Sequence, residues 1–128
     1  MLQFSPNLVA GATINPYRIV KMDTTAFTGI ASTAAGDYVV GVTDGSTRRF
    51  DSSAHAIAGD QISLQPSNCV QIEAGGNITA GQAVKASTGG VAVATTTTGD
   101  VALYVAMEGA ASGQIFWAYR LPATKAIP

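Results

Sequence analysis

Short apolar runs separated by turn residues occupy most of this chain. In the most regular run, residues 114–121, alternate positions on one side of the pleat are Ile115, Trp117, Tyr119 and Leu121. This period of two predicts a β-strand whose successive side chains point to opposite faces of a sheet. Further strands are predicted at residues 17–22, 38–42, 61–65, 69–73, 83–87, 91–94 and 101–107. Because turn residues recur about every ten positions and no segment keeps a helical period over several turns, we expect an all-β fold, a small barrel or sandwich with little or no helix.

Glycine-containing turns connect the predicted strands. Asp44-Gly45 predicts a tight hairpin between residues 38–42 and 46–50. Gly89-Gly90 predicts a second hairpin, between residues 83–87 and 91–94. Residues 51–58 are compatible with one helical turn, capped by Ser52 or Ser53.

A short phrase recurs at these turns: a small residue, a glycine, then Asp or Gln, and then a strand. It occurs at residues 34–37, 58–60, 80–82, 98–100 and 112–114. Glycine takes a positive φ at no steric cost, and the side chain that follows it can bond a nearby backbone N–H. Because the spacings between these glycines are irregular, the phrase indicates one turn type reused in a compact β fold and not a solenoid repeat.

The first 16 residues have neither strand nor helix periodicity. Pro6 and Pro16 disfavour helix at the residues before them, so we expect an extended N-terminal arm. Its apolar residues would be a liability on a free monomer unless the arm lies on a partner; they are Phe4, Leu8, Val9 and Ile14. The alternative is a terminal strand packed against its own domain. The expected organisation is an arm at 1–16, a single β domain at 17–121 and a C-terminal tail at 122–128.

Composition narrows the class of protein. The chain has 128 residues, of which 47% are hydrophobic, 7% aromatic and 12% charged, with a net charge of -1. These values argue against a disordered chain and a helical bundle, and the single Cys69 argues against a disulfide scaffold. Either neutral polar side chains keep the surface wet, or a partner covers part of it. We favour the second interpretation because the mean hydropathy is +0.25.

Charge distribution also limits the partners. Arg48-Arg49 is the only adjacent basic pair, whereas a nucleic-acid binder carries a basic stripe, so no nucleic-acid partner is expected. No apolar run is long enough to span a membrane, so no membrane partner is expected. The N-terminal residues also lack the basic and apolar regions of a secretory signal.

Candidate chemistry is sparse. His55 is the only histidine, and although Asp51 and Ser53 lie near it, no G-x-S-x-G elbow accompanies them. One cysteine and one histidine cannot form a structural zinc site, and the sequence has neither a calcium-binding loop nor a phosphate-binding glycine loop. Cys69 is interpreted as a small buried hydrophobe. We therefore expect no catalytic residue, no metal site and no cofactor, and hence no enzyme.

Three segments together resemble a known family. They are residues 78–86 (ITAGQAVKA), 91–94 (VAVA) and 105–115 (VAMEGAASGQI), in which a Gly-Asp/Gln turn leads into a strand and a small-residue hairpin leads out. This pattern resembles the capsid decoration, or cement, proteins of tailed phages. The resemblance covers roughly residues 34–121 and not the N-terminal arm, and the segment 45–51 (GSTRRFD) departs from the family pattern.

The resemblance implies a β-tulip-like small barrel and a non-enzymatic role on the virion. Such proteins sit on the outer surface of an icosahedral head, often as homotrimers, and clamp neighbouring major capsid protein subunits. By this resemblance the protein is made in the host cytoplasm, and its partners are the major capsid protein and further copies of itself, as a homotrimer. The alternatives are a head fibre, spike or receptor-binding module, and a small β-barrel ligand-binding domain.

Roles on the capsid or in an oligomer are also hypothesised for particular side chains, of which those in the arm and at 48–49 lie outside the segments that carry the resemblance. The expected capsid contacts are Phe4, Leu8, Val9, Ile14, Arg48 and Arg49. The residues expected in an oligomer interface or in the core are Phe116, Trp117 and Tyr119.

Overall fold

A computed structural model of the chain describes residues 8–32, 39–45, 56–95 and 101–126, and the structural statements below refer to these residues. Within them the fold is all-β, so the predicted fold class is confirmed. Ten strands are joined by turns, and the one helical element among these residues is a short 3-10 turn, η1, at Thr88–Gly90.

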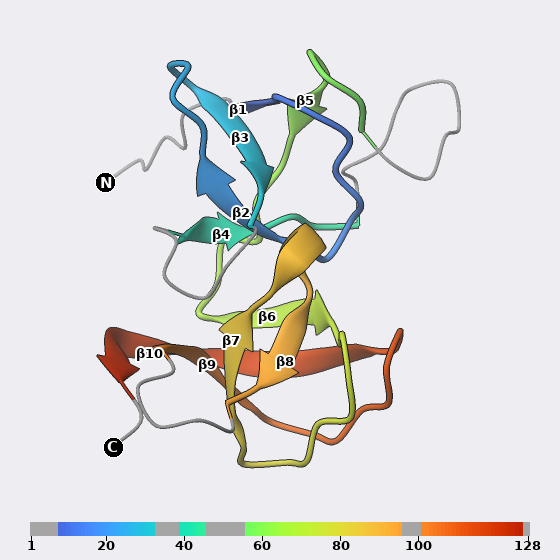
Figure 1. Ribbon diagram of the computed structural model, residues 1–128, viewed down its shortest axis with the longest axis vertical. Coiled ribbons are helices and arrows are strands. Elements are labelled where there is room, and N and C mark those ends of the chain that lie inside the picture. Colours follow the sequence, from blue (N-terminus) through green and yellow to red (C-terminus); the bar gives the residue numbers. More distant parts are fainter. Residues whose placement is uncertain (1–7, 33–38, 46–55, 96–100, 127–128) are drawn as a thin grey trace.

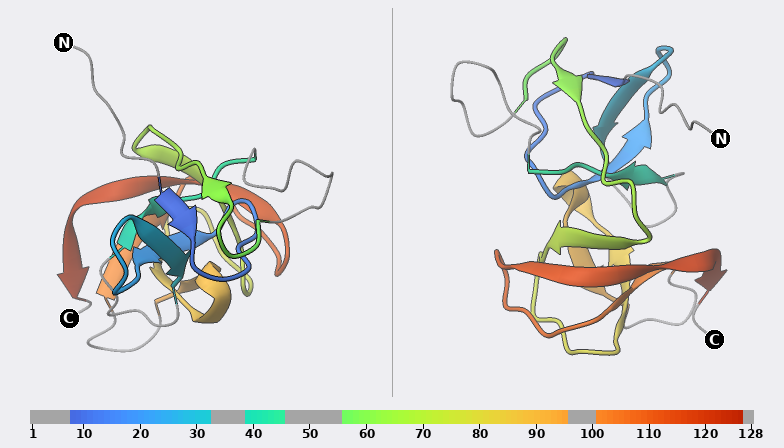
Figure 2. Two further views of the ribbon diagram at one scale, coloured as in Figure 1. Left: turned by 90° about the horizontal axis from the view of Figure 1, so that it is seen from above. Right: turned by 180° about the vertical axis from the view of Figure 1, so that it is seen from behind.

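The strands form two five-stranded sheets that follow one another along the chain (Figure 1). The first sheet has the order β4-β2-β3-β1-β5, with β1 at Leu8–Ala10, β2 at Ile19–Met22, β3 at Thr28–Ala31, β4 at Val39–Val42 and β5 at Gln61–Ile62. The second has the order β6-β10-β9-β7-β8, with β6 at Cys69–Glu73, β7 at Ala83–Ala86, β8 at Ala92–Ala94, β9 at Val101–Ala106 and β10 at Ile115–Ala126. Figure 1 and the right-hand view of Figure 2 show the two sheets one above the other along the longest axis.

Both sheets curl until their outer strands meet. In the first sheet an antiparallel bridge joins Thr43, just after β4, to Leu64, which follows β5. In the second sheet a parallel bridge joins Ala74, just after β6, to Ala92 in β8. The strands therefore have the same circular order in both halves, in which β6 to β10 take the places of β1 to β5.

The two halves repeat one fold. The cross-strand pairs also correspond: Lys21 of β2 pairs with Ile30 of β3, and Lys85 of β7 pairs with Val93 of β8. Residues 10–22 match residues 74–86 at a constant separation of 64 positions, and the pairs with identical residues are Ala10 and Ala74, Gly11 and Gly75, Ile14 and Ile78, Val20 and Val84, and Lys21 and Lys85. The sequence alone does not reveal this duplication, because so few positions are identical. The strands that were expected to form one β domain at 17–121 thus belong to two barrels.

The expected domain limits fall inside elements of the structure. Residues 8–10 of the expected arm form β1, which pairs with β3 and β5. Ile14 is 1% exposed, so this part of the arm packs against its own domain, which was the alternative prediction. The limit at residue 121 lies within β10, which continues to Ala126 and pairs there with Val101 of β9.

Three of the predicted Gly-Asp/Gln turns lie among the described residues, and they share one set of hydrogen bonds. The glycines Gly59, Gly81 and Gly113 have φ angles of 92, 85 and 86°. In each turn the side-chain oxygen after the glycine accepts a hydrogen bond from the backbone N–H three residues earlier: Asp60 from Ile57 at 2.9 Å, Gln82 from Thr79 at 3.1 Å and Gln114 from Ala111 at 2.8 Å. The predicted turn chemistry is therefore confirmed; the turns at 34–37 and 98–100 lie outside the described residues.

These turns also hold the ends of other strands. The N–H groups of Gly59, Gly81 and Gly113 each donate at 2.8 Å to a buried alanine carbonyl, respectively that of Ala10, Ala106 and Ala74. The N–H of the same alanine donates back to the carbonyl of Asp60, Gln82 or Gln114. Each turn is therefore bonded to the end of another strand and also reverses the chain.

The hairpin predictions have separate outcomes. The Gly89-Gly90 turn joins β7 to antiparallel β8, and both glycines have φ near +80°, so this prediction is confirmed. The run expected to pair across Asp44-Gly45, at 46–50, lies outside the described residues. So does most of the segment 51–58, where one helical turn was expected.

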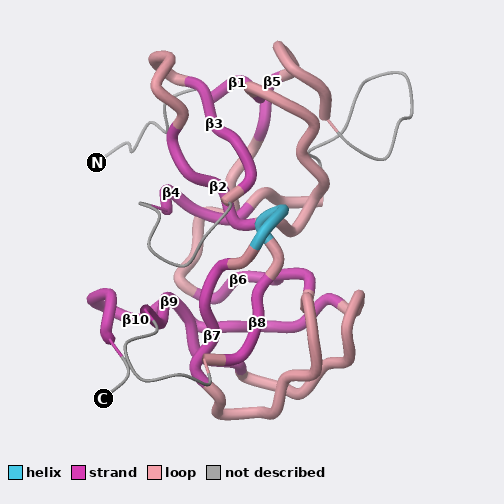
Figure 3. Tube along the Cα trace, viewed as in Figure 1, coloured by secondary structure: helices cyan, strands magenta, loops and turns pink. Residues whose placement is uncertain are grey.

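The two barrels share a hydrophobic core. Ile19 of β2 and Val42 of β4 are fully buried in a cluster whose other buried members come from the second half, including Tyr104 and Phe116. A smaller cluster, which includes Leu8, Val20 and Ile62, lies within the first barrel. Figure 3 shows η1, the cyan segment, at the junction between the two sheets, where it connects β7 to β8. The relative position of the barrels is therefore fixed by packing.

Candidate interaction surface

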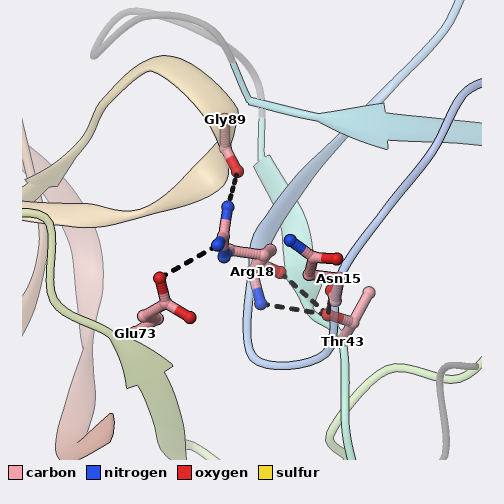
Figure 4. Close-up of polar contacts among 5 residues, drawn as sticks. All are labelled: Asn15, Arg18, Thr43, Glu73 and Gly89. Carbon is pink, nitrogen blue, oxygen red and sulfur yellow. Dashed lines mark hydrogen bonds and ion pairs between the residues drawn. The ribbon is translucent and has the colours of Figure 1, made fainter. Parts of the chain in front are cut away.

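A polar cluster fixes the two barrels to each other (Figure 4). Arg18 lies between them: its Nη2 atom donates to Oε2 of Glu73 at 2.9 Å, and its Nη1 atom donates to the carbonyl of Gly89 at 2.9 Å. Its backbone N–H donates to Oγ1 of Thr43, whose hydroxyl donates to the carbonyl of Asn15 at 2.8 Å. The side chains of Arg18 and Glu73 are 17% and 27% exposed, so the ion pair is partly shielded from solvent. This cluster connects β6 and η1 to the turn before β2.

The outer side of β10 carries large apolar side chains that the chain itself does not cover. Ile115, Trp117 and Tyr119 are 38%, 44% and 42% exposed. Met107, whose N–H donates to the carbonyl of Trp117 at 2.8 Å, is 54% exposed beside them. Phe116, between them in sequence, is 1% exposed and belongs to the core. We call Ile115, Trp117, Tyr119 and Met107 the β10 face.

The residues that border the β10 face are mostly neutral. On β6, Cys69, Gln71 and Glu73 stand opposite Tyr119, Trp117 and Ile115, and on β9 Val105 stands opposite Tyr119. Both carboxylates near the face are engaged within the chain: Glu73 with Arg18, and Glu108 with the backbone N–H of Trp117 at 3.0 Å. Glu73 is therefore paired with a cation, whereas the exposed carboxylate of Glu108 carries its charge beside Trp117.

The duplicated fold provides an internal comparison for this face. Val9 of β1 pairs with Gln61, and the equivalent Glu73 of β6 pairs with Ile115. The first barrel therefore has Gln61, Ser63 and Gln65 at the positions that Ile115, Trp117 and Tyr119 occupy in the second. Gln61 and Ser63 are exposed, and Gln65 is half-buried. The same strand position thus folds with polar side chains in one half and with large apolar ones in the other. The fold itself does not require the apolar set.

A second set of exposed apolar residues belongs to the first barrel. Phe27 is 61% exposed and has a φ of 53°, a left-handed conformation that is strained for a phenylalanine. Phe27 lies two residues before Gly29, the partner of Met22. In the second half Gly90 lies two residues before Ala92, the partner of the equivalent Ala86, and has a φ of 80°. Val9, whose N–H donates to the carbonyl of Phe27 at 2.9 Å, is 37% exposed, and Met22 is 41% exposed. We call Val9, Met22 and Phe27 the first-barrel patch.

The residues predicted as capsid contacts have different positions in the structure. Leu8 and Ile14 are 8% and 1% exposed, so in this fold they belong to the protein's own core and are not available to a partner. Val9, between the buried Leu8 and Ala10, is exposed, so its contact with the capsid stays a prediction. Phe4, Arg48 and Arg49 lie outside the described residues.

The other candidate residues also separate into exposed, buried and undescribed ones. Of the three interface or core candidates, Phe116 is core, whereas Trp117 and Tyr119 are exposed. Cys69, expected to be buried, is half-buried on β6. The candidate catalytic residues Asp51, Ser53 and His55 lie outside the described residues. The sequence pattern does not single out Phe27, and its equivalence to Gly90 becomes visible only once the duplication is known.

The described residues show one clear electrostatic perturbation. Burial raises the pKa of the Tyr104 hydroxyl above its ordinary value, and the neighbouring charge and hydrogen bond of Arg120 partly offset this shift. Within the same residues no group of three or more His, Cys, Asp or Glu side chains is placed to hold a metal ion. Their one helical element is also far too short to cross a membrane.

Together these features define a class: a duplicated two-barrel β protein with two separate exposed apolar surfaces. No protein-family model matches the chain. No curated protein matches it either. Among solved structures the chain is similar to the N base of the head fiber gp8.5 of bacteriophage phi29, with a TM-score of 0.67 and 19% sequence identity. The similarity covers 93% of this chain and 94% of that one, so the two share a fold over nearly their whole lengths.

Proposed function

We propose that this chain is a non-enzymatic structural protein of a phage virion, attached to the outer surface of the head as the base of a head fibre. The observation that supports this role best is the fold shared with a head fiber base over nearly the whole of both chains. A head fibre is one of the alternatives that the sequence leaves open. The sparse charge and the absence of catalytic motifs from the sequence are consistent with a structural role.

A second candidate is a decoration protein that bridges neighbouring major capsid protein subunits. Bridging needs two separate binding surfaces at a fixed distance, and the β10 face and the first-barrel patch lie on two barrels that Arg18 and a shared core hold together. Several modest contacts would then multiply through effective concentration. In both candidates the partner is the major capsid protein. The homotrimer implied by the family resemblance stays a prediction, as does the lack of nucleic-acid and membrane partners.

We assign the capsid contact to the first-barrel patch. Phe27 is an exposed aromatic ring on a backbone fixed by a hydrogen bond from Val9 at its carbonyl and by one between Asp23 N–H and the Thr28 carbonyl at 2.8 Å. An aromatic side chain on an ordered backbone has few rotatable bonds to fix on binding, and such residues are frequent energetic centres of interfaces. The left-handed φ of Phe27 costs stability, which favours a role for the ring outside folding.

The test uses heads of the phage that encodes the chain, prepared without this protein. Wild-type chain and Phe27→Gly are mixed with these heads, and the bound fraction is measured by co-sedimentation. Glycine suits the left-handed backbone, so Phe27→Gly should be at least as stable as wild type yet bind at least tenfold more weakly. If wild type does not bind heads, the proposed function is wrong. If both proteins bind equally, the head attachment holds and the assignment to the first-barrel patch fails.

A further inference from the structure

We propose that the β10 face, together with the carboxylate of Glu108, binds an arginine side chain presented by a segment of a partner protein. The proposal goes beyond head attachment, because it concerns a different surface from the first-barrel patch and names the chemistry that binds there. Its starting point is the repeat. The first barrel has Ser63 where the second has Trp117, and the strand folds with either residue. The exposed ring therefore needs an explanation other than folding.

The carboxylate beside the ring is also specific to the second barrel. The N–H of Met107 donates to the carbonyl of Trp117 at 2.8 Å, as the N–H of Asp44 donates to the carbonyl of the equivalent serine at 3.0 Å. The residue after Met107 is Glu108, whereas the residue after Asp44 is Gly45, which has no side chain. The first barrel therefore folds with neither the ring nor the acid at these two positions, and the second barrel has both.

The charge of Glu108 favours a cationic partner. Its Oε2 atom accepts a hydrogen bond from the backbone N–H of Trp117 at 3.0 Å, which holds the exposed carboxylate next to the residue that carries the ring. Among the described residues no Lys or Arg pairs with this carboxylate, and Arg18 is paired with Glu73 instead. The face therefore presents aromatic rings beside a negative charge that no described cation neutralises. A cation is attracted by both.

Arginine is the cation that suits this arrangement best. A planar guanidinium group can lie against the ring of Trp117 or Tyr119 while the N–H donors at its edge reach a carboxylate. The ammonium group of a lysine has no such plane and is more strongly hydrated. The exposed side chains of Ile115 and Met107 offer apolar surface to the stem of the arginine and to its neighbours in a partner segment.

The size of the face predicts how strong the contact is. With aromatic side chains of roughly 150–250 Å² each, the exposed fractions of the four apolar side chains leave roughly 400 Å² of apolar surface. A stable interface between two folded proteins buries about 800 Å² per partner, so the face suits a short segment that presents one arginine. An isolated peptide should therefore bind weakly and reversibly, in the millimolar to submillimolar range.

A pair of peptides tests the assignment. The two short peptides have the same sequence, except that one has an arginine between two leucines and the other has the uncharged isostere citrulline in its place. Each is titrated into the full-length chain, and binding is followed through the fluorescence of Trp117, which is the only tryptophan. The arginine peptide should bind about three- to tenfold more tightly than the citrulline peptide. This ratio should fall as the salt concentration rises.

Glu108→Gln is the matched variant, because the glutamine side-chain carbonyl can still accept the Trp117 N–H while the charge is lost. The preference for arginine over citrulline should fall about twofold or more, and the affinity for the citrulline peptide should not change. Asp60→Asn is the control: it removes a carboxylate charge that accepts a backbone N–H in the same way, from Ile57, but in the first barrel, so the preference should stay as in wild type.

Trp117→Ser introduces the residue of the first barrel and removes the ring. Because this variant also lacks the fluorescent reporter, its binding is measured by calorimetry, and both peptides should bind at least fivefold more weakly. Urea unfolding checks that all three variants are folded, and the comparison of the two peptides on wild type does not depend on any variant.

Three results would overturn the proposal. The first is a wild-type chain that does not bind the arginine peptide or binds both peptides equally. The second is a folded Glu108→Gln or Trp117→Ser variant that binds as wild type does, or an Asp60→Asn variant that loses the preference equally. The third is tighter binding of the same peptide with leucine in place of arginine, or of a neutral oligosaccharide, which would assign the face to an apolar partner or a saccharide. Because these measurements contain no heads, they are independent of the test of head attachment.

Discussion

Gly90 makes a close approach between the two barrels, and replacing it tests how tightly they are packed. A Cβ atom at this position would lie 2.5 Å from the carbonyl oxygen and 3.1 Å from the amide nitrogen of Ile19, which are backbone atoms of β2. The φ of Gly90 is 80°, and its N–H donates to the carbonyl of Ser32 at 2.9 Å. Because the obstructing atoms are backbone, no side-chain rotation relieves the clash, and the turn itself is fixed to the first half.

Two terms set the expected cost of Gly90→Ala. A left-handed backbone costs an ordinary residue roughly 1–2 kcal/mol. Overpacking against a well-packed site costs about 1–3 kcal/mol more. The free energy of unfolding should therefore fall by about 2–5 kcal/mol. This is a large part of the stability of a small domain, which is about 5–15 kcal/mol.

Substitutions at two other glycines separate the backbone cost from the overpacking cost. A Cβ at Gly81 would meet nothing within 4 Å, but its φ is 85°, so Gly81→Ala should cost only the backbone term of about 1–2 kcal/mol. Gly76 also has open space and no left-handed φ, so Gly76→Ala should change stability by less than about 0.5 kcal/mol. Urea unfolding of the three variants measures the series. If Gly90→Ala costs no more than Gly81→Ala, the close approach of η1 to β2 is wrong.

Three further predictions concern polar groups. Gln114→Ala removes the acceptor of the Ala111 N–H in an exposed turn and should cost about 0.5–1 kcal/mol in urea unfolding, while Gln114→Glu, which keeps an acceptor oxygen, should cost less. Arg18→Met keeps the packed stem but removes two charged hydrogen bonds between the barrels, so we expect a loss of about 1–3 kcal/mol; an unchanged stability would refute the role of this cluster. Burial raises the pKa of Tyr104, so the folded state holds the phenol proton more tightly than the unfolded state does. The resulting contribution to the free energy of unfolding is complete below pH 10 and is lost as the pH rises through the folded pKa. Unfolding experiments at increasing pH should show this loss in wild type and a flatter profile in Tyr104→Phe.

Much of the local structure follows from short stretches of sequence. The runs at 69–73, 83–87 and 101–107 each contain a strand of the structure, and Gly89-Gly90 forms the expected hairpin. The turn prediction at 58–60, 80–82 and 112–114 extends to the side-chain hydrogen bond itself. These features are predictable because a positive φ at glycine and an acceptor on the next residue are decided within four residues of the chain.

The candidate surfaces were less predictable. The period of two in β10 places Phe116 opposite Trp117 and Tyr119, but both faces of this strand are apolar, so the pattern does not say which face is covered. In the structure Phe116 and the small Ala118 point into the barrel, because a closed five-stranded barrel has little room inside. The larger side chains of Trp117 and Tyr119 then lie outside.

The sequence by itself determined that this protein is all-β, where most of its strands lie, and how its turns are bonded, since these depend on contacts between near neighbours. Only the tertiary structure decided that the strands form two copies of one barrel, that Leu8 and Ile14 pack inward, and that the β10 face remains uncovered. The physical reason is that barrel closure joins residues far apart in the chain, such as Thr43 with Leu64. Burial is fixed by that closure and not by the local pattern.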